Sequence, residues 1–275
     1  MTPAGDKQRR LDAILEEMGS VVIAFSGGVD SAYLAVRAHR VLGERALAVT
    51  ADSPSLASAQ RDMALALARE FGFAHRVVLT SEVEDPLYAR NDADRCFHCK
   101  TELFRHLGPI AAAGGYRHLA YGAIVDDLSD VRPGHRAAAD AGVRSPLVEA
   151  EMTKADVRER SREMGLPTWD LPASPCLSSR IPRGTTVTPE ILRQVERAEE
   201  AVRALGFREL RVRHLGDTAR VEIAPAELSR LDAPRRAAVE QAVLAAGYRA
   251  CLIDPNGYRR GRLNEPLALP VIGPA

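Results

Sequence analysis

The residues best suited to chemistry form the string Ser26-Gly-Gly-Val-Asp-Ser31, which directly follows four consecutive apolar residues, 21–24. Gly27 and Gly28 let the backbone turn sharply and come close to a ligand. The two serine hydroxyls and the N–H groups of a helix that opens at this point place donors around one concavity. The string therefore predicts a phosphate-binding loop between a strand buried on both faces and a helix.

The loop differs from a Walker loop, in which a lysine reaches the outer phosphates of a nucleotide. Val29 and Asp30 stand in its middle instead. A carboxylate beside a polyphosphate requires a cation such as Mg²⁺ between them, so we expect Mg²⁺ at Asp30. A tight turn whose serines only cap the helix is the plainer alternative.

Three cysteines lie in segments where a thiol could react or bind a metal. Cys96 and Cys99 form a Cys-x-x-Cys pair that opens an expected helix, beside cationic side chains such as Lys100. This spacing favours metal binding or redox chemistry, and two small buried side chains are an equally good interpretation. Cys176 lies in residues 169–185, whose prolines exclude a regular element, and we expect a reactive thiol or a metal ligand there.

Charged side chains elsewhere also suit a nucleotide ligand. Asp126 and Asp127 follow an expected strand and could hold Mg²⁺ or orient a ribose, although solvated turn acids are the usual explanation of such a pair. Lys154, in the first turn of an expected capped helix, is a candidate phosphate ligand. Arg211 and Arg213 share one face of an expected strand, which suits a clamp on a phosphate monoester, whereas solvated arginines are the competing account.

The elements that must position these residues follow from the apolar pattern. Short apolar strands alternate with amphipathic helices, an order typical of a doubly wound parallel sheet, whose ligands bind beyond the carboxyl ends of the strands. We therefore predict an α/β fold with the phosphate loop and Ser53 at that edge. The predicted strands are residues 21–24, 46–50, 74–79, 118–124 and 145–148, and the predicted helices are residues 7–18, 31–39, 56–71, 101–113 and 153–165.

The pattern changes after Thr188-Pro189, a predicted capped helix start. Helical patterns and alternating strands beyond it predict a smaller C-terminal α+β domain, with Cys251 in its core. We place an N-terminal domain at residues 1–170, an active-site loop that carries Cys176 at residues 171–188, and the C-terminal domain, for substrate binding and oligomerisation, at residues 189–275.

Composition narrows the classes of function. The chain has 275 residues, 46% of them hydrophobic, which suffices for a sizeable core. Lys+Arg and Asp+Glu both number 37, so we expect no nucleic-acid or membrane partner. The first residues lack an apolar signal core and no run approaches a membrane span, so we expect a cytoplasmic protein whose four cysteines form no disulfides.

Taken together, these strings resemble the LarE family, PP-loop ATP pyrophosphatases that insert sulfur during synthesis of the nickel-pincer nucleotide of lactate racemase. The Pro-Cys-Leu-Ser-Ser-Arg string ending at Arg180 points to this branch, and the resemblance spans roughly residues 7–255. One departure is Gly122-Ala-Ile-Val125, where a polar string such as Gly-Thr-Asn is expected. The strings that carry the resemblance are Ser26–Ser31, Arg95–Lys100, Asp126–Gly134, Ser174–Thr185 and Arg211–Arg213.

The resemblance implies an adenine nucleotide alpha hydrolase-like PP-loop domain and a reaction in two steps. A carboxylate of a pyridinium-3,5-biscarboxylic acid mononucleotide attacks the α-phosphate of Mg·ATP and releases pyrophosphate, and sulfur then displaces AMP. The implied nucleotide contacts are Ser26, Gly27, Gly28, Val29, Ser31, Ser53, Gly122, Asp126, Asp127 and Lys154. The implied catalytic residues are Cys176, Asp30 and Arg180, and the implied substrate contacts are Lys100, Ser179, Arg211 and Arg213.

The resemblance leaves two sources for the sulfur. In one, Cys176 gives up its own sulfur and becomes dehydroalanine. In the other, three cysteines hold a 4Fe-4S cluster, and the presence of Cys96, Cys99 and Cys176 favours this version because three ligands leave one iron open. The resemblance also implies a homo-oligomer, with a hexamer as the candidate assembly.

Rival functions follow from the same superfamily. A tRNA thiolase would also adenylate and transfer sulfur, but the neutral net charge argues against RNA binding. An amidating synthetase would use ammonia and would need no cysteine. A nucleotide-sensing module, which binds ATP without releasing pyrophosphate, is the non-enzymatic alternative.

Overall fold

The computed structural model describes residues 3–128 and 133–259. The chain divides into two compact units, one through Cys176 and one from Leu177 onward. Residues 129–132, part of the polar loop after Asp127, and residues 260–275, the end of the expected C-terminal domain, lie outside the described residues.

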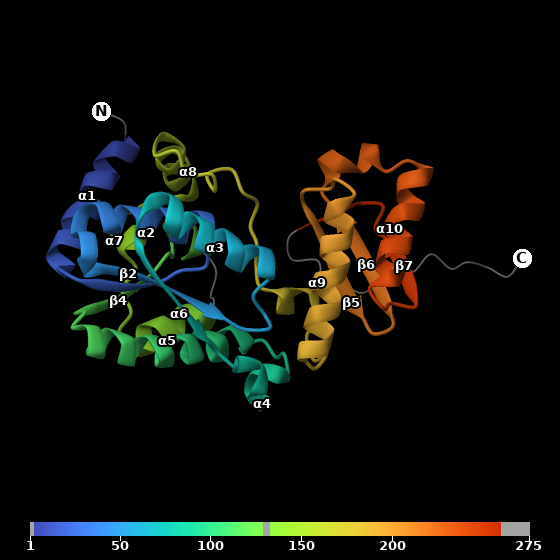
Figure 1. The fold of residues 1–275 in the computed structure, drawn as a ribbon, viewed down its shortest axis with the longest axis horizontal. Helices are drawn as coiled ribbons and strands as arrows, with labels where there is room; N and C mark the ends of the chain where they lie inside the picture. Colours follow the sequence, from blue (N-terminus) through green and yellow to red (C-terminus); the bar gives the residue numbers. More distant parts are fainter. Residues whose placement is uncertain (1–2, 129–132, 260–275) are drawn as a thin grey trace, which may run out of the picture. The chain divides into compact units, whose positions relative to one another are not determined.

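The first unit is built on a parallel sheet that has four strands in the described residues, in the order β3-β2-β1-β4 (Figure 1). All four residues of β1 are apolar and buried, so this strand lies inside the sheet. Val22 pairs with Leu47 of β2 and with Leu119 of β4, which brings the carboxyl ends of three strands to one edge. The strands are β1 (Val21–Ala24), β2 (Ala46–Asp52), β3 (Ala74–Leu79) and β4 (His118–Tyr121).

Helices cover both faces of this sheet, which confirms the predicted α/β fold (Figure 1). The side chains of β1 alternate between two cores. Val21 and Ile23 pack with α1, α2 and α8, whereas Val22 and Ala24 pack with α5 and α6. The helices are α1 (Pro3–Met18), α2 (Val29–Leu42), α3 (Ser58–Phe71), α4 (Pro86–Ala89), α5 (Arg95–Gly114), α6 (Pro133–Asp140), α7 (Pro146–Glu149) and α8 (Lys154–Glu163), with 3₁₀ turns η1 (Gly43–Arg45), η2 (Glu82–Glu84) and η3 (Val125–Asp127).

The predicted strand at residues 145–148 is wrong, because Pro146–Glu149 form the short helix α7. Proline fits the first position of a helix, where its missing N–H needs no partner, but it removes a ladder bond from a strand. Beside this helix, the described chain touches the sheet through the isolated bridge between Ala120 and Arg144. The apolar run was too short to distinguish a strand from a helix.

The second unit contains, in its described residues, a three-stranded sheet of order β5-β6-β7. β5 and β6 are antiparallel, and β7 lies parallel to β6. The Thr188 hydroxyl accepts from the Ile191 N–H at 3.3 Å and caps α9, as predicted, and Cys251 packs against the core. The elements are η4 (Leu177–Arg180), α9 (Pro189–Ala204), β5 (Leu210–Leu215), β6 (Thr218–Ile223), η5 (Pro225–Arg230), α10 (Ala233–Ala245) and β7 (Ala250–Ile253).

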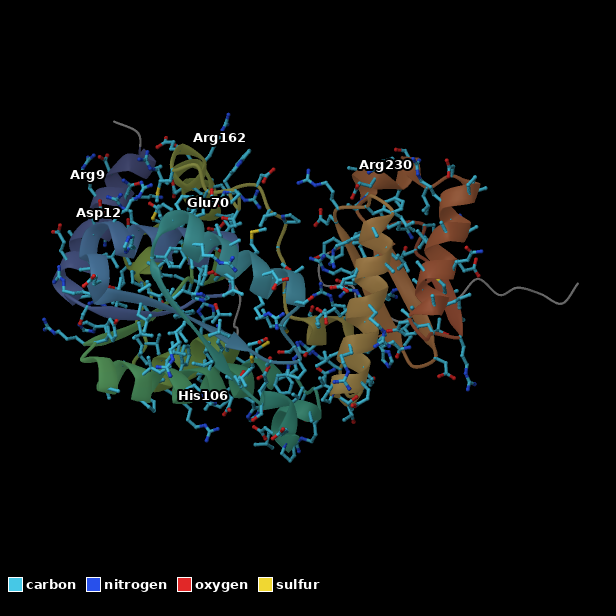
Figure 2. The ribbon with its side chains drawn as sticks, in the orientation of Figure 1. Arg9, Asp12, Glu70, His106, Arg162 and Arg230 are labelled. Carbon is cyan, nitrogen blue, oxygen red and sulfur yellow. The ribbon has the colours of Figure 1, made fainter. Side chains whose placement is uncertain are left out.

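Charged side chains lie on the outer faces of the helices. Figure 2 labels Arg9 on α1, Glu70 on α3 and Arg162 on α8, and all three are exposed. The opposite faces of these helices carry the apolar residues that cover the sheet. Among the described residues, no helix has both the length and the apolar character needed to cross a bilayer.

Candidate active site

The loop between β1 and α2 closes on itself through its two serines. Ser31 Oγ donates to the Gly28 carbonyl oxygen at 3.2 Å and accepts from the Ser26 N–H at 3.2 Å, and the two hydroxyl oxygens lie 3.1 Å apart. Gly27 has a φ of +73°, and a Cβ there would lie 3.2 Å from the Gln60 carbonyl oxygen, so this position requires glycine. The loop therefore has a fixed shape, with the first N–H groups of α2 beside it.

The end of β4 supports the same loop. A Cβ at Gly122 would lie 2.9 Å from the Ser31 nitrogen and 3.0 Å from the Ser31 Cα. The backbone after β4 thus abuts the first turn of α2, and any side chain at residue 122 would displace the loop. Ala123 and Ile124 are buried, which explains why apolar residues stand where a polar string was expected.

Asp30 and Lys154, predicted to serve Mg²⁺ and phosphate, form an ion pair. Lys154 Nζ lies 2.6 Å from Oδ1 and 2.5 Å from Oδ2 of Asp30. Burial raises the pKa of Asp30 above its ordinary value, the charge of Lys154 opposes this shift, and the charge of Asp127 adds to it. Asp126 accepts from the Lys154 N–H at 2.9 Å. Charged residues from α2, η3 and α8 therefore meet beside the loop.

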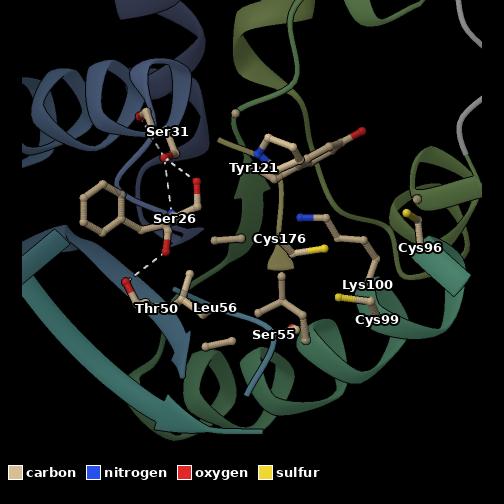
Figure 3. A pocket seen from close by; sticks show the side chains of 18 of the residues that line it. Ser26, Ser31, Thr50, Ser55, Leu56, Cys96, Cys99, Lys100, Tyr121 and Cys176 are labelled. Carbon is tan, nitrogen blue, oxygen red and sulfur yellow. Dashed lines mark hydrogen bonds between the residues drawn. The ribbon is translucent and has the colours of Figure 1, made fainter. Parts of the chain in front are cut away.

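A cavity of about 520 Å³ adjoins the loop and falls within the size range of ligand pockets (Figure 3). The residues that line it come from the first unit. Of the predicted site residues, those that line the cavity are Ser26, Gly28, Asp30, Ser31, Ser53, Cys96, Cys99, Lys100, Gly122, Asp127 and Cys176. Gly27, Val29, Asp126 and Lys154 are not part of its lining.

Three thiols, those of Cys96, Cys99 and Cys176, line this cavity together with Lys100. Figure 3 shows the sulfur atoms of Cys99 and Cys176 facing one another, with the Lys100 amine beside them. Burial, followed by the charges of Cys176 and Glu82, raises the pKa of Cys99 to about 12. The Cys-x-x-Cys pair, in the first turns of α5, thus lies close to the thiol of the proline-rich loop.

Arg95 is a half-buried cation among these thiols. Its Nη1 donates to Asn91 Oδ1 at 2.5 Å, and its guanidinium also bonds the side chain of Cys96. Burial alone would lower the pKa of Arg95, but the negative charges that Cys176 and Cys96 can carry raise it. Arg95 and Lys100 therefore place two cations on the thiol side of the cavity, where an anionic ligand could bind, although burial outweighs the charge of Lys100 at Cys99 itself.

A single metal ion and an iron–sulfur cluster require different arrangements of ligands. Within residues 3–128 and 133–259, no three His, Cys, Asp or Glu side chains gather as ligands of a single metal ion. An iron–sulfur cluster binds each thiolate at a separate iron, and the three cysteines of the cavity fit that donor set in chemistry. Mg²⁺ takes one or two carboxylates together with phosphate oxygens and water, for which Asp30 and Asp127 line the cavity.

The ends of β2 and β3 form a polar wall, of which sequence reasoning found Ser53 but missed Ser55, Thr80 and Glu82. Ser53 and Ser55 donate to Glu82 Oε1 at 2.6 and 2.5 Å, and Thr80 donates to Glu82 Oε2 at 3.0 Å. All four line the cavity, and Glu82 is only 4% exposed. Their position directly after two strands is the signal that could have found them, because ligands bind at this edge of the sheet.

The predicted arginines belong to the second unit, where each contacts protein groups. Arg180 donates to Glu199 through Nε at 2.8 Å and Nη2 at 3.1 Å. Arg213 donates to Glu222 at 2.8 Å and to the Ser179 carbonyl oxygen at 2.9 Å.

Arg211 and Arg213 lie on one face of β5, as the alternation predicted. Both are buried, and the Arg211 guanidinium lies 4.9 Å from the centre of the Tyr258 ring. The alternative interpretation of these two residues as solvated arginines is therefore wrong. Their role as a phosphate clamp stays a prediction.

Comparisons with known proteins identify the family. No profile of a known protein family matches the chain. It is 42% identical over 262 residues to an uncharacterised protein of Synechocystis, which covers 95% of this chain and 98% of that protein. It is 35% identical over 268 residues to the pyridinium-3,5-bisthiocarboxylic acid mononucleotide synthase of Lactiplantibacillus plantarum, which covers 97% of both chains.

A more distant relative is a subunit of another enzyme. A chain of the glutamine-hydrolysing GMP synthase of Pyrococcus furiosus is 28% identical over 228 residues, 73% of this chain and 70% of that protein. This similarity and the parallel sheet with its glycine-rich loop indicate an ATP-using enzyme of the PP-loop type. Since the Lactiplantibacillus synthase matches along nearly the whole length of both proteins, the chain belongs to the LarE family of PP-loop enzymes.

Proposed function

We propose that this chain uses ATP to adenylate carboxylates of a pyridinium-3,5-biscarboxylic acid mononucleotide and converts them to thiocarboxylates for nickel-pincer nucleotide synthesis. The observation that carries the proposal is a single cavity lined by both the PP-loop and three thiols. Adenylation followed by sulfur attack requires the nucleotide and the sulfur donor to meet in one place. The Lactiplantibacillus relative is named for this thiocarboxylate product, which supports the substrate class.

In the first step, a carboxylate oxygen of the substrate attacks the α-phosphorus of ATP. The bond from that phosphorus to the oxygen shared with the β-phosphate breaks, and pyrophosphate leaves. The N–H groups at the start of α2 and the hydroxyls of Ser26 and Ser31 stabilise the departing negative charge. Asp30 and Asp127 would hold Mg²⁺, which neutralises the outer phosphates, and Lys154 supplies a second cation beside the loop.

In the second step, a sulfur nucleophile attacks the carbonyl carbon of the acyl adenylate. The bond from that carbon to the AMP oxygen breaks, and the thiocarboxylate remains. Arg95 and Lys100 are placed to bind the anionic groups that gather there. Cys176 is the thiol that the family resemblance assigns to this step, and its position in the lining of the cavity supports that role.

The source of the sulfur is the finer part of the proposal. A 4Fe-4S cluster bound by Cys96, Cys99 and Cys176 would supply replaceable sulfur, so that one chain could act repeatedly. In the alternative, Cys176 transfers its own sulfur: its Cβ–Sγ bond breaks, its Cα loses a proton, and dehydroalanine remains. Each chain would then act once.

The second unit is proposed to bind the phosphate of the substrate mononucleotide. Burial, followed by the charge of Arg180, lowers the pKa of Arg211, and a bound phosphate would stabilise the charged guanidinium. Arg213 lies on the same face of β5, and Ser179 and Arg180 complete the proposed site. A homo-oligomer, with a hexamer as the candidate, is part of the proposal and is tested by sedimentation.

Product analysis tests the function. Anaerobically purified full-length protein is incubated with ATP, Mg²⁺ and the pyridinium biscarboxylic acid mononucleotide, and pyrophosphate, AMP and thiocarboxylate are measured. We expect Cys176→Ala to release pyrophosphate without forming thiocarboxylate, whereas Cys251→Ala, altered in the second unit, should retain both activities. ADP and orthophosphate as products would refute the adenylation.

Two further measurements separate the alternatives. Iron and acid-labile sulfide analysis tests the cluster, and a colourless, iron-free protein that loses one sulfur from Cys176 per turnover would reject it. In parallel reactions, ammonium replaces the sulfur nucleophile, or tRNA replaces the mononucleotide substrate. Full activity of Cys176→Ala with ammonium would favour an amidating synthetase, and a salt-dependent tRNA shift would favour a tRNA thiolase.

A further inference from the structure

Glu82 is a buried carboxylate in the wall of the cavity, and its hydrogen-bond donors are neutral. Ser53 and Ser55 donate to Oε1, and Thr80 donates to Oε2. In the described part of the chain, no lysine, arginine or histidine forms an ion pair with it. Since a buried charge is costly without a cation or a full set of hydrogen bonds, this arrangement requires an explanation.

The number of hydrogen bonds leaves one acceptor site for a ligand. An ionised carboxylate offers about four acceptor sites. Two hydroxyls occupy Oε1 and one occupies Oε2, so the remaining site is on Oε2. Because Glu82 lines the cavity, a bound molecule can supply the missing donor.

The chemistry of ATP limits which part can lie against this carboxylate. The phosphates of ATP carry negative charge and only accept hydrogen bonds, so they are repelled by Glu82. The donors of ATP are on its nucleoside: the ribose hydroxyls and the adenine amino group. The position agrees with this choice, because Glu82 and its partners follow β2 and β3, whereas the phosphate loop follows β1.

We propose that Glu82 recognises the nucleoside of ATP by accepting a hydrogen bond from a ribose hydroxyl or from the adenine amino group. This inference rests on the proposed ATP-dependent function. The three hydroxyls hold the carboxylate between the ends of two strands, so little conformational freedom is lost when the ligand binds. A base that presents an acceptor in place of the amino group would face the carboxylate unfavourably.

The test compares Glu82→Gln with Glu84→Gln, an exposed glutamate in the same 3₁₀ turn. Calorimetry on the full-length chain with Mg²⁺ measures the dissociation constants of ATP, 2′-deoxy-ATP, 3′-deoxy-ATP and the purine riboside triphosphate that lacks the 6-amino group. Glu82→Gln should weaken ATP binding at least about tenfold, as expected for a hydrogen bond to a charged group, and Glu84→Gln should leave it unchanged.

The analogues distinguish recognition from a structural role. If Glu82 contacts one donor, Glu82→Gln has no further effect on the analogue that lacks this donor, and the insensitive analogue identifies the contact. If Glu82→Gln weakens the binding of all four ligands equally, or weakens the binding of none, the inference is overturned while the proposed function stays intact. If the wild-type chain bound no ATP, the proposed function would fail, and the inference with it.

A second variant, Thr80→Val, tests the same contact in case Glu82→Gln fails to fold. Thr80→Val keeps the carboxylate and removes one of the hydroxyls that hold it. We expect Thr80→Val to weaken ATP binding less than Glu82→Gln does, with the same insensitive analogue, and circular dichroism checks that both variants fold. A Thr80→Val pattern in which every analogue is weakened alike would contradict nucleoside recognition.

Discussion

Replacing Glu199 with glutamine removes a negative charge from the interior of the second unit. Glu199 is 1% exposed and accepts hydrogen bonds from Arg180 Nε at 2.8 Å, Arg180 Nη2 at 3.1 Å, Arg203 Nη2 at 2.6 Å and the Val212 N–H at 3.0 Å. Burial by itself would raise the pKa of Glu199, but the charge and hydrogen bonds of Arg180, aided by Arg203 and Val212, hold it below its ordinary value.

The size of the expected loss of stability follows from the burial of Glu199 and Arg180. Glutamine offers one acceptor oxygen and one donating amide, so at least one arginine N–H would face another donor. Arg180, itself 2% exposed, would lose the carboxylate to which it donates through Nε and Nη2. Removing one partner of a buried ion pair costs about 3–5 kcal/mol. With a urea m-value of about 2 kcal/mol per M, the unfolding midpoint should fall by about 2 M.

Urea unfolding of the full-length chain, followed by far-UV circular dichroism, measures this change. Glu200→Gln, an exposed neighbour, is the matched control. Because the pKa of Glu199 is lowered in the folded state, its ionisation contributes stability above its ordinary pKa of 4.5, and this contribution is lost as the pH falls through the folded-state pKa. The gap between wild type and Glu199→Gln should therefore be largest near neutral pH and shrink in acid.

Two results would refute this reasoning. One is a Glu199→Gln midpoint within about 0.3 M of the Glu200→Gln midpoint at neutral pH. The other is a gap that grows on acidification. The first would mean that the negative charge of Glu199 contributes little to the stability of the folded second unit, and the second would mean that folding does not lower the pKa of Glu199.

Two further predictions concern the loop. Gly122→Ala would push a Cβ to 2.9 Å from the Ser31 nitrogen, so we expect ATP binding at least about tenfold weaker and a stability loss of about 1–3 kcal/mol. Gly108→Ala, with nothing within 4 Å, is the control, and unchanged ATP affinity in Gly122→Ala would contradict the contact. Lys154→Met should raise the pKa of Asp30 further, because the charge of Lys154 opposes that shift. The Mg·ATP affinity measured by calorimetry should therefore fall more at about pH 6, where more of the Asp30 carboxyl is protonated, than at about pH 8. A loss independent of pH would contradict this role of Lys154.

The fold of the first unit could be predicted because its signals are local. The four apolar residues of β1, the glycines after them and the amphipathic pattern of α2 lie next to one another in the sequence. The same holds for Thr188, whose cap on α9 depends on a residue three positions later. The failure at residues 146–149 has the converse cause, since so short an apolar run is compatible with one turn of a helix as well as with a buried strand.

Much of the candidate site could not be predicted, because its contacts join distant segments. Glu82 gains its role only when Ser53 and Ser55, from the neighbouring strand end, reach its carboxylate. The string that contains Arg180 drew attention to a possible catalytic role, yet its partner Glu199 lies on another element. Spacing in a sequence reports neighbours along one helix or strand, and it does not report which elements meet.

The order of the strands also governs when the site can exist during protein synthesis. β1 lies between β2, which follows it closely, and β4, which begins only at His118. The phosphate loop thus lacks its support at Gly122, and the cavity lacks its last thiol at Cys176, until the ribosome has released the whole first unit. A nascent chain would therefore complete its nucleotide site late, and ATP would then stabilise finished first units over truncated ones.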